Sequence, residues 1–101
     1  MSNQPSIGVS SAFEAFLSVA PAHAKAWRGM VKGLDTASAL DKKTEHLSYL
    51  AVLAALRLDS GVPFHVHLAK QAGASRAEVV SAILVGLPAA GTGRCARARL
   101  A

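Results

Sequence analysis

Residues 41–58 read DKKTEHLSYLAVLAALRL, and this stretch decides the fold class. Asp41 is a favourable N-cap, because its carboxylate can accept hydrogen bonds from the amides of a helix's first turn. In the following residues 47–56, Ser48 alone is not apolar. A helix that is apolar on nearly every side is buried on nearly every side. The stretch therefore predicts a helix that the short helices of one small domain cannot enclose, which favours an oligomer.

Two helices are expected after this stretch. Residues 59–63 read DSGVP and predict a break, after which Ser60 caps a helix that ends at Gly73. Ser75 and Glu78 have the spacing of a capping box and predict the start of the last helix, which Pro88 ends. Consecutive helices with a short link pack antiparallel, so an antiparallel helix hairpin is the expected core.

Two shorter amphipathic segments precede the stretch. The first begins near Ser10 or Ser11 and carries Phe13, Phe16 and Leu17 on one helical face. Pro21 suits the first turn of the second helix, and Gly33 is its expected end. One side of that helix is apolar through Trp27, Met30, Val31 and Leu34. With no alternating pattern of strands, the sequence predicts an all-α domain of about five helices.

Length and composition indicate a single domain. The chain has 101 residues, of which 51% are apolar and only 17% are charged, which is typical of one compact unit with apolar surface left for another subunit. We expect a flexible N-terminal arm over residues 1–9, the folded domain over residues 10–92 and a basic C-terminal tail over residues 93–101.

The charge pattern argues against nucleic acid and membranes as partners. The net charge is +5, but the basic residues are scattered apart from the tail residues Arg94, Arg97 and Arg99, with no aromatic residues interleaved to stack on bases. Residues 20–22 resemble a signal-peptide cleavage site, yet no basic residue precedes the apolar run. Residues 47–56 are about half the length of a membrane-spanning helix. We therefore expect a cytoplasmic protein.

Two histidines are the strongest candidates for chemistry. Of His23, His46, His65 and His67, the expected hairpin would place His46 and His65 on facing walls. His67 is two residues after His65 and points about 200° away around the helix. Two histidines without HExxH spacing fall short of a catalytic zinc site, so no metal is expected.

The chain's one cysteine, Cys95, rules out an internal disulfide and a dithiol mechanism within one chain. Arg94 and Arg97 beside it would lower the pKa of the thiol and raise its thiolate fraction. No base or resolving cysteine is evident next to Cys95 in the sequence, which favours an incidental thiol in the tail over redox chemistry.

Four segments together resemble the carboxymuconolactone decarboxylase family, which includes the alkylhydroperoxidase D proteins. They are LDKKTEHL (residues 40–47), AVLAALR (residues 51–57), FHVH (residues 64–67) and AGASRAEV (residues 72–79). The resemblance covers roughly residues 12–92 and is specific over residues 40–87. It implies an all-α fold, like that of alkylhydroperoxidase D, whose subunits assemble as trimers or hexamers.

The resemblance implies different chemistry in its two branches. The peroxidase branch uses a Cys-x-x-Cys, a His four residues after the second cysteine and a Glu on the preceding helix. Matching that His to His65 places Leu58 and Gly61 at the two cysteines and His46 at the Glu, with Glu45 displaced by one residue. Without a thiolate nucleophile the peroxidase cycle cannot run at this site. The decarboxylase branch needs no cysteine pair and no cofactor.

The leading hypothesis is a cofactor-free acid–base enzyme of lyase or isomerase type that acts on a small organic acid. His65 would deliver the proton and His46 would be its partner or bind the anion, and Tyr49, Gly61 and Phe64 are expected to bind the substrate. The alternative is a non-catalytic binding or structural oligomer of the same fold. A peroxidase-like, peroxiredoxin-type activity is the third and disfavoured hypothesis. The expected partners are further copies of the chain, as a homotrimer or homohexamer, and a small carboxylated substrate.

Overall fold

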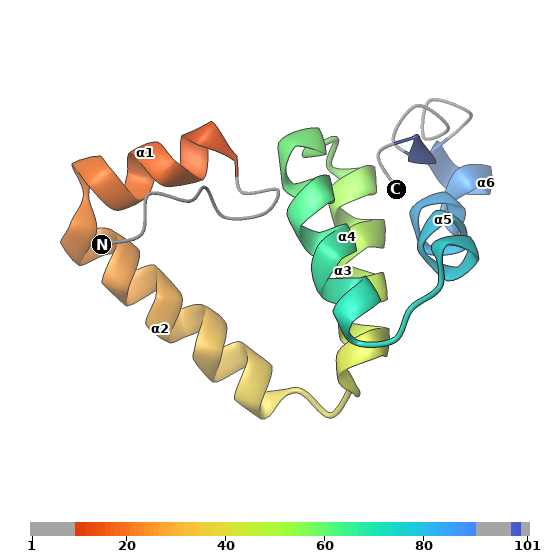
Figure 1. Ribbon diagram of the computed structural model, residues 1–101, viewed down its shortest axis with the longest axis horizontal. Coiled ribbons are helices and arrows are strands. Elements are labelled where there is room, and N and C mark those ends of the chain that lie inside the picture. Colours follow the sequence, from red (N-terminus) through yellow and green to blue (C-terminus); the bar gives the residue numbers. More distant parts are fainter. Residues whose placement is uncertain (1–9, 91–97, 100–101) are drawn as a thin grey trace.

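The computed structural model describes residues 10–90, 98 and 99, which form helices and turns with no strand among them. The elements are α1 (Ser11–Val19), α2 (Pro21–Ala37), α3 (Lys42–Ala55), the 3-10 turn η1 (Asp59–Gly61), α4 (Val62–Gln71), α5 (Arg76–Leu84) and the one-turn α6 (Leu87–Ala90). The prediction of an all-α fold with about five main helices is confirmed. Figure 1 shows α1 and α2 standing as a pair to one side of α3, α4 and α5.

The core lies between α3, α4 and α5. α3 and α4 run antiparallel and side by side, as the hairpin prediction required, and α5 packs against α3 (Figure 1). The fully buried side chains of the core come from all three helices. They are Leu50, Val62, Ala69, Val79 and Ile83. The periodic spacing of these apolar residues along each helix is what directs one face of each helix inward.

Three helix starts form as the sequence predicts. Ser10 and Asp41 each accept a hydrogen bond from the backbone amide three residues on, so both act as N-caps. At α5 the Ser75 hydroxyl accepts from the Glu78 amide at 3.1 Å, and the Glu78 carboxylate accepts from the Ser75 amide at 2.9 Å. This complete capping box fixes where α5 begins.

Three helix boundaries differ from the prediction. α2 continues past Gly33 to Ala37, because a glycine on an exposed helix face costs only about 1 kcal/mol relative to alanine. Ser60 does not cap α4, since it lies inside η1 and the helix begins after Gly61. Pro88 does not end α5, which stops at Leu84; the proline is instead the second residue of α6, where its missing N–H needs no partner.

The described helices of the single chain do not enclose α3 on every side. Leu50, Leu53 and Ala54 are buried, but Tyr49 and Val52 keep about half of their surface exposed. α4 and α5 cover one part of the helix, and among the described residues no other helix makes comparably extensive contact with it.

The arm over residues 1–9 lies outside the described residues, as does the tail of residues 93–101 apart from Ala98 and Arg99. Ala98 packs against the core cluster of α3, α4 and α5. Among the described helices, none has the combined length and hydropathy that a bilayer crossing requires.

Substitution by alanine should change the stability of the fold in opposite directions at Gly73 and at Gly33. Gly73 has φ +99°, which strains an L side chain, whereas Gly33 is helical with no atom within 4 Å of an added Cβ. We expect Gly73→Ala to lower the free energy of unfolding by about 1 kcal/mol, and Gly33→Ala to raise it by about 0.5–1 kcal/mol. Urea unfolding midpoints measure both changes, and equal shifts of the same sign would contradict the prediction.

Candidate functional site

His65 lies against two aromatic rings. The imidazole stacks on the ring of Tyr49 from α3, with the ring centroids 4.2 Å apart and the planes 26° from parallel. The neighbouring Phe64 meets the imidazole edge-on, with the centroids 5.4 Å apart and the planes at 83°. Two of the three residues expected to bind substrate therefore contact the expected acid–base histidine. The stack holds the imidazole ring between α3 and α4.

The surroundings of His65 favour its neutral form. Partial burial lowers the pKa of His65 below its ordinary value, and the positive charge of His46 lowers it further. His46 is thus close enough for its charge to act on His65, although no hydrogen bond joins the two side chains. His65 Nδ1 is buried and has no hydrogen-bond partner among the described residues. This nitrogen is therefore an unsatisfied buried polar atom of the candidate site.

A charged cluster lies next to His46 where α2 meets α3. Lys42 donates to Asp35 of α2 and lies 3.6 Å from Glu45 Oε2, which is itself buried and without a hydrogen bond. The hydrogen bond from Lys42 lowers the pKa of Asp35, and the charge of His46 acts in the same direction. Nothing in the sequence singles out Asp35, which precedes His46 by eleven residues and belongs to no motif.

Gly61 and Leu58 occupy the two positions matched to cysteines. Gly61 lies at the start of α4, where an added Cβ would meet the Leu53 methyl groups at an ordinary 3.5 Å. A side chain at position 61 would therefore fit, and the glycine is not required for space or for its backbone conformation. Gly61 contributes no functional group that could contact a substrate beyond its backbone. Cys95 lies outside the described residues.

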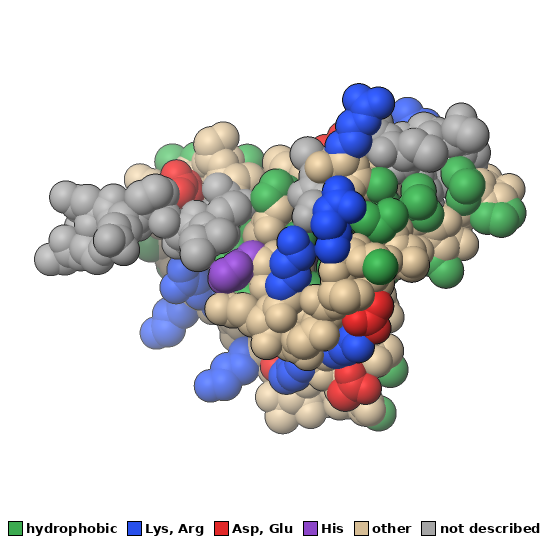
Figure 2. Space-filling view, turned by 45° about the vertical axis from the view of Figure 1, so that its right-hand side comes forward, with side chains coloured by type: hydrophobic (Ala, Val, Ile, Leu, Met, Phe, Trp, Pro, Cys, Tyr) green, Lys and Arg blue, Asp and Glu red, His purple; other side chains and the backbone are tan. Residues whose placement is uncertain are grey.

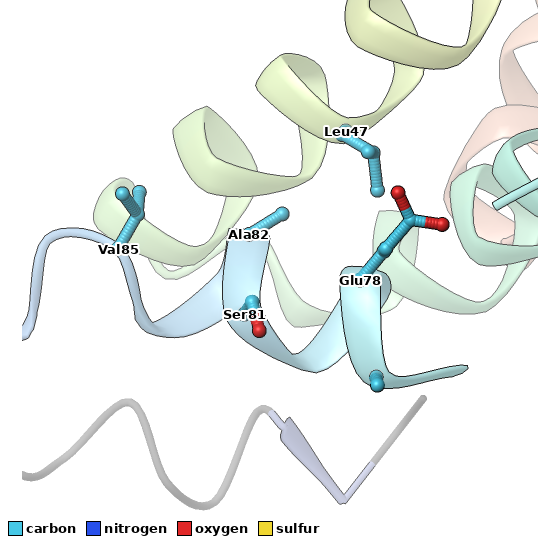
Figure 3. A pocket seen from close by; sticks show the side chains of 6 residues that line it. Leu47, Glu78, Ser81, Ala82 and Val85 are labelled. Atoms are coloured by element: carbon cyan, nitrogen blue, oxygen red, sulfur yellow. The ribbon is translucent and has the colours of Figure 1, made fainter. Parts of the chain in front are cut away.

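A hollow of about 390 Å³ lies between α3 and α5, apart from the histidines. It is lined by Leu47, Ala77, Glu78, Ser81, Ala82 and Val85, and Figure 3 shows Leu47 and Glu78 reaching toward each other across it. The Glu78 carboxylate is already occupied, since one oxygen accepts from the Ser75 amide and the other pairs with Lys43 at 2.6 Å. The lining is otherwise mostly apolar and offers little acid–base chemistry.

The described surface is basic and offers no metal cluster. In the view of Figure 2, Lys and Arg side chains are more prominent than Asp and Glu, and hydrophobic side chains are exposed beside them. The described residues contain no group of three or more His, Cys, Asp and Glu side chains placed to hold a metal ion. Such a surface attracts an anion.

His65 should make folding stability depend on pH. Its pKa is lowered in the folded chain, whereas the unfolded chain has the ordinary value of about 6.5. Below that pH the unfolded chain binds more protons, so the free energy of unfolding falls as pH falls from 7 to 5. We expect His65→Gln to lose less stability over this range, measured by urea unfolding at each pH. Asp35 and Glu78, whose pKa values are lowered, stay ionised throughout the range. If the free energy of unfolding depends on pH in the same way in the wild type and in His65→Gln, the prediction is wrong.

A protein-family model matches most of the chain. The model of the carboxymuconolactone decarboxylase family matches residues 21–101, which include α2 to α6 and both histidines. No curated protein and no solved structure matches the chain significantly.

Proposed function

Because the chain belongs to the carboxymuconolactone decarboxylase family, we propose that it is a cofactor-free acid–base enzyme, of lyase or isomerase type, acting on a small carboxylated compound. The observation that carries the proposal is the environment of His65: a partly buried imidazole, stacked on Tyr49, with an unbonded Nδ1 and a second imidazole within electrostatic reach. A group of this kind can exchange protons near neutral pH.

A bound carboxylate would change the protonation of His65. The free site disfavours the imidazolium through burial and through the charge of His46. An anionic substrate beside both rings would offset these effects and raise the pKa of His65. His46 is the group proposed to bind the carboxylate. The surplus of basic side chains on the surface favours the approach of such a substrate.

The proposed lyase step is a decarboxylation. The carbon–carbon bond to the carboxylate breaks, carbon dioxide leaves, and the electron pair remains on the former α-carbon. The His65 imidazolium gives its proton to that carbon, becomes neutral and takes its next proton from water. In the isomerase variant, neutral His65 instead removes a proton from one carbon of the substrate and returns it to another.

The residues present support this chemistry over a peroxidase cycle. Leu58 and Gly61 stand where the peroxidase branch has its cysteines, and neither can form a thiolate. The position of the branch's Glu is occupied by His46, which carries the opposite charge when protonated. We therefore disfavour a peroxidase-like antioxidant activity at this site.

The chain is also proposed to act as an oligomer in the cytoplasm. The family resemblance implies a trimer or a hexamer, and the exposed apolar residues of α2 and α3 agree with burial against further copies. A non-catalytic oligomer of the same fold is the alternative. It is favoured by the position of the hollow, which lies between α3 and α5 and does not include either histidine.

Turnover in D2O tests the proposal. A panel of small carboxylated lactones and dicarboxylic acids is first screened for thermal stabilisation, since a ligand of the folded chain raises the melting temperature. Each ligand found is then incubated in D2O and followed by NMR. We expect release of carbon dioxide with one deuterium on the former α-carbon, or deuterium exchange in an isomerisation. Ligands that bind without any deuterium incorporation, or a panel without a ligand, would support the non-catalytic alternative.

A further inference from the structure

One face of α3 leads from the turn after α2 to the His65 site. Lys42, His46 and Tyr49 follow at i, i+4 and i+7, so they share one side of the helix. At the start of this face Lys42 donates to Asp35 of α2, and at its end Tyr49 stacks on His65. His46 lies between the two and is partly buried. Charge gathered around Lys42 is therefore only one helical turn from His46.

The side chains of Asp35, Lys42 and Glu45, which we call the junction cluster, carry more negative than positive charge. Lys42 bonds Asp35 and lies 3.6 Å from Glu45 Oε2, so one ammonium group is shared by two carboxylates. Glu45 Oε2 is buried and has no hydrogen-bond partner among the described residues. A buried carboxylate oxygen without a donor is costly, and a nearby cation offsets that cost. The cluster therefore favours a further positive charge beside it.

His46 is placed to supply that positive charge. The pKa of Asp35 is lowered chiefly by the hydrogen bond from Lys42, and the charge of His46 lowers it further. Because the attraction is mutual, the Asp35 carboxylate favours the charged form of the His46 imidazole. On its other side the same charge adds to burial in lowering the pKa of His65. The surroundings thus push the two histidines toward opposite protonation states, an arrangement that gives two similar groups different roles.

We propose that Asp35 is a positioning residue that, with Glu45, keeps His46 charged, so that His46 binds the substrate carboxylate while His65 stays neutral in the free site. Asp35 acts through His46 and does not itself touch the substrate. The titratable groups around His46 are Asp35 from α2, Lys42, Glu45 and Tyr49 on α3 and His65 from α4, whereas Glu78 of α5 pairs with Lys43. The binding of a carboxylate rests on the proposed function; the effect of Asp35 on the two histidines does not.

NMR titration of the His65 imidazole in the ligand-free protein tests the effect of Asp35. His46→Gln removes the charge that acts on His65, so the pKa of His65 should shift upward. Asp35→Asn should shift the pKa of His65 in the same direction by a smaller amount, because His46 then loses part of its charge. A direct effect of Asp35 on His65 would have the opposite sign, since loss of an anion disfavours an imidazolium. A downward shift, or no shift, in Asp35→Asn would overturn the proposal.

Lys42→Gln is the matched control for Asp35→Asn. It breaks the same contact between α2 and α3 but removes a positive charge instead of a negative one. Both side chains are about half exposed, so both variants should fold. We expect Lys42→Gln to leave the pKa of His65 unchanged or to shift it downward, because the two carboxylates then act on His46 without a competing ammonium. Equal upward shifts in both variants would mean that the contact only tethers α2, and would overturn the proposal.

Calorimetric titration with succinate tests the same residue with a carboxylate present. At neutral pH we expect Asp35→Asn to bind succinate about two- to fivefold more weakly than the wild type, the size of a partly exposed charge pair. Removing a carboxylate would by itself favour an anion, so weaker binding identifies the action through His46. At about pH 5, where an ordinary imidazole is protonated without help, the difference should disappear. Equal or tighter binding by Asp35→Asn at neutral pH, or a wild type that does not bind succinate, would overturn this role. The ligand-free titration needs no substrate, so its result is independent of whether turnover is found.

Discussion

Replacing His65 with glutamine is expected to lower the turnover of a carboxylated substrate by about 10²- to 10⁴-fold, the range for loss of a general acid or base. Glutamine retains polarity and similar size, so it keeps the packing against Tyr49 but cannot exchange a proton. The loss should therefore fall on kcat more than on KM. Steady-state rates on a substrate found in the ligand screen measure it.

His67→Gln is the matched control for this variant. His67 lies on the same helix two residues later, about 200° around it, and is also partly buried. It is not part of the stack of Tyr49 on His65. Turnover of His67→Gln should stay within a few-fold of the wild type. Equal losses in both variants would mean that the effect comes from α4 packing, and unchanged turnover in His65→Gln would refute its catalytic role.

Truncating Leu50 is expected to have the largest effect on stability. Leu50 is 0% exposed and lies at the centre of the core that α3 shares with α4 and α5. Leu50→Ala removes apolar contacts and leaves a cavity, which costs about 2–5 kcal/mol in a buried leucine. A domain of this size has about 5–15 kcal/mol of stability in total, so the change removes a large part of it. Urea unfolding followed by circular dichroism measures the difference.

Val19→Ala is the control for this truncation. Val19 ends α1 and is 82% exposed, so its truncation should change the free energy of unfolding by less than about 0.5 kcal/mol. If Leu50→Ala lowers the free energy of unfolding by less than about 1 kcal/mol, Leu50 is not packed in the core in the way that the structure indicates.

Local signals predicted the parts of the fold that local hydrogen bonds determine. The caps at Asp41 and Ser75 and the left-handed stop at Gly73 depend on residues within one helical turn, so the sequence reveals them. α3 ends at Ala55, before the break predicted at residues 59–63, and Arg57 in the turn that follows adopts φ 59°, a conformation that a side chain other than glycine rarely takes. There the Leu58 amide donates to the Leu53 carbonyl at 2.9 Å and fixes the turn.

Tertiary packing determined what the sequence could not reveal about the site. The hairpin prediction correctly placed α3 beside α4, but the stack of Tyr49 on His65 depends on how the two helices are rotated. The same holds for the position of Asp35 beside Lys42 and Glu45, which requires the turn between α2 and α3. The roles of His46, His65, Tyr49, Gly61 and Phe64 stay predictions, and so do the arm, domain and tail boundaries.

The most direct test of the acid–base site is an NMR titration of the His65 imidazole with and without a small carboxylate that stabilises the protein. We expect a pKa below 6.5 in the free protein and a rise when the carboxylate binds, because the anion offsets burial and the charge of His46. The rise should shrink in His46→Gln if His46 holds the anion. A bound carboxylate that leaves the His65 titration unchanged would show that the anion does not bind beside His65.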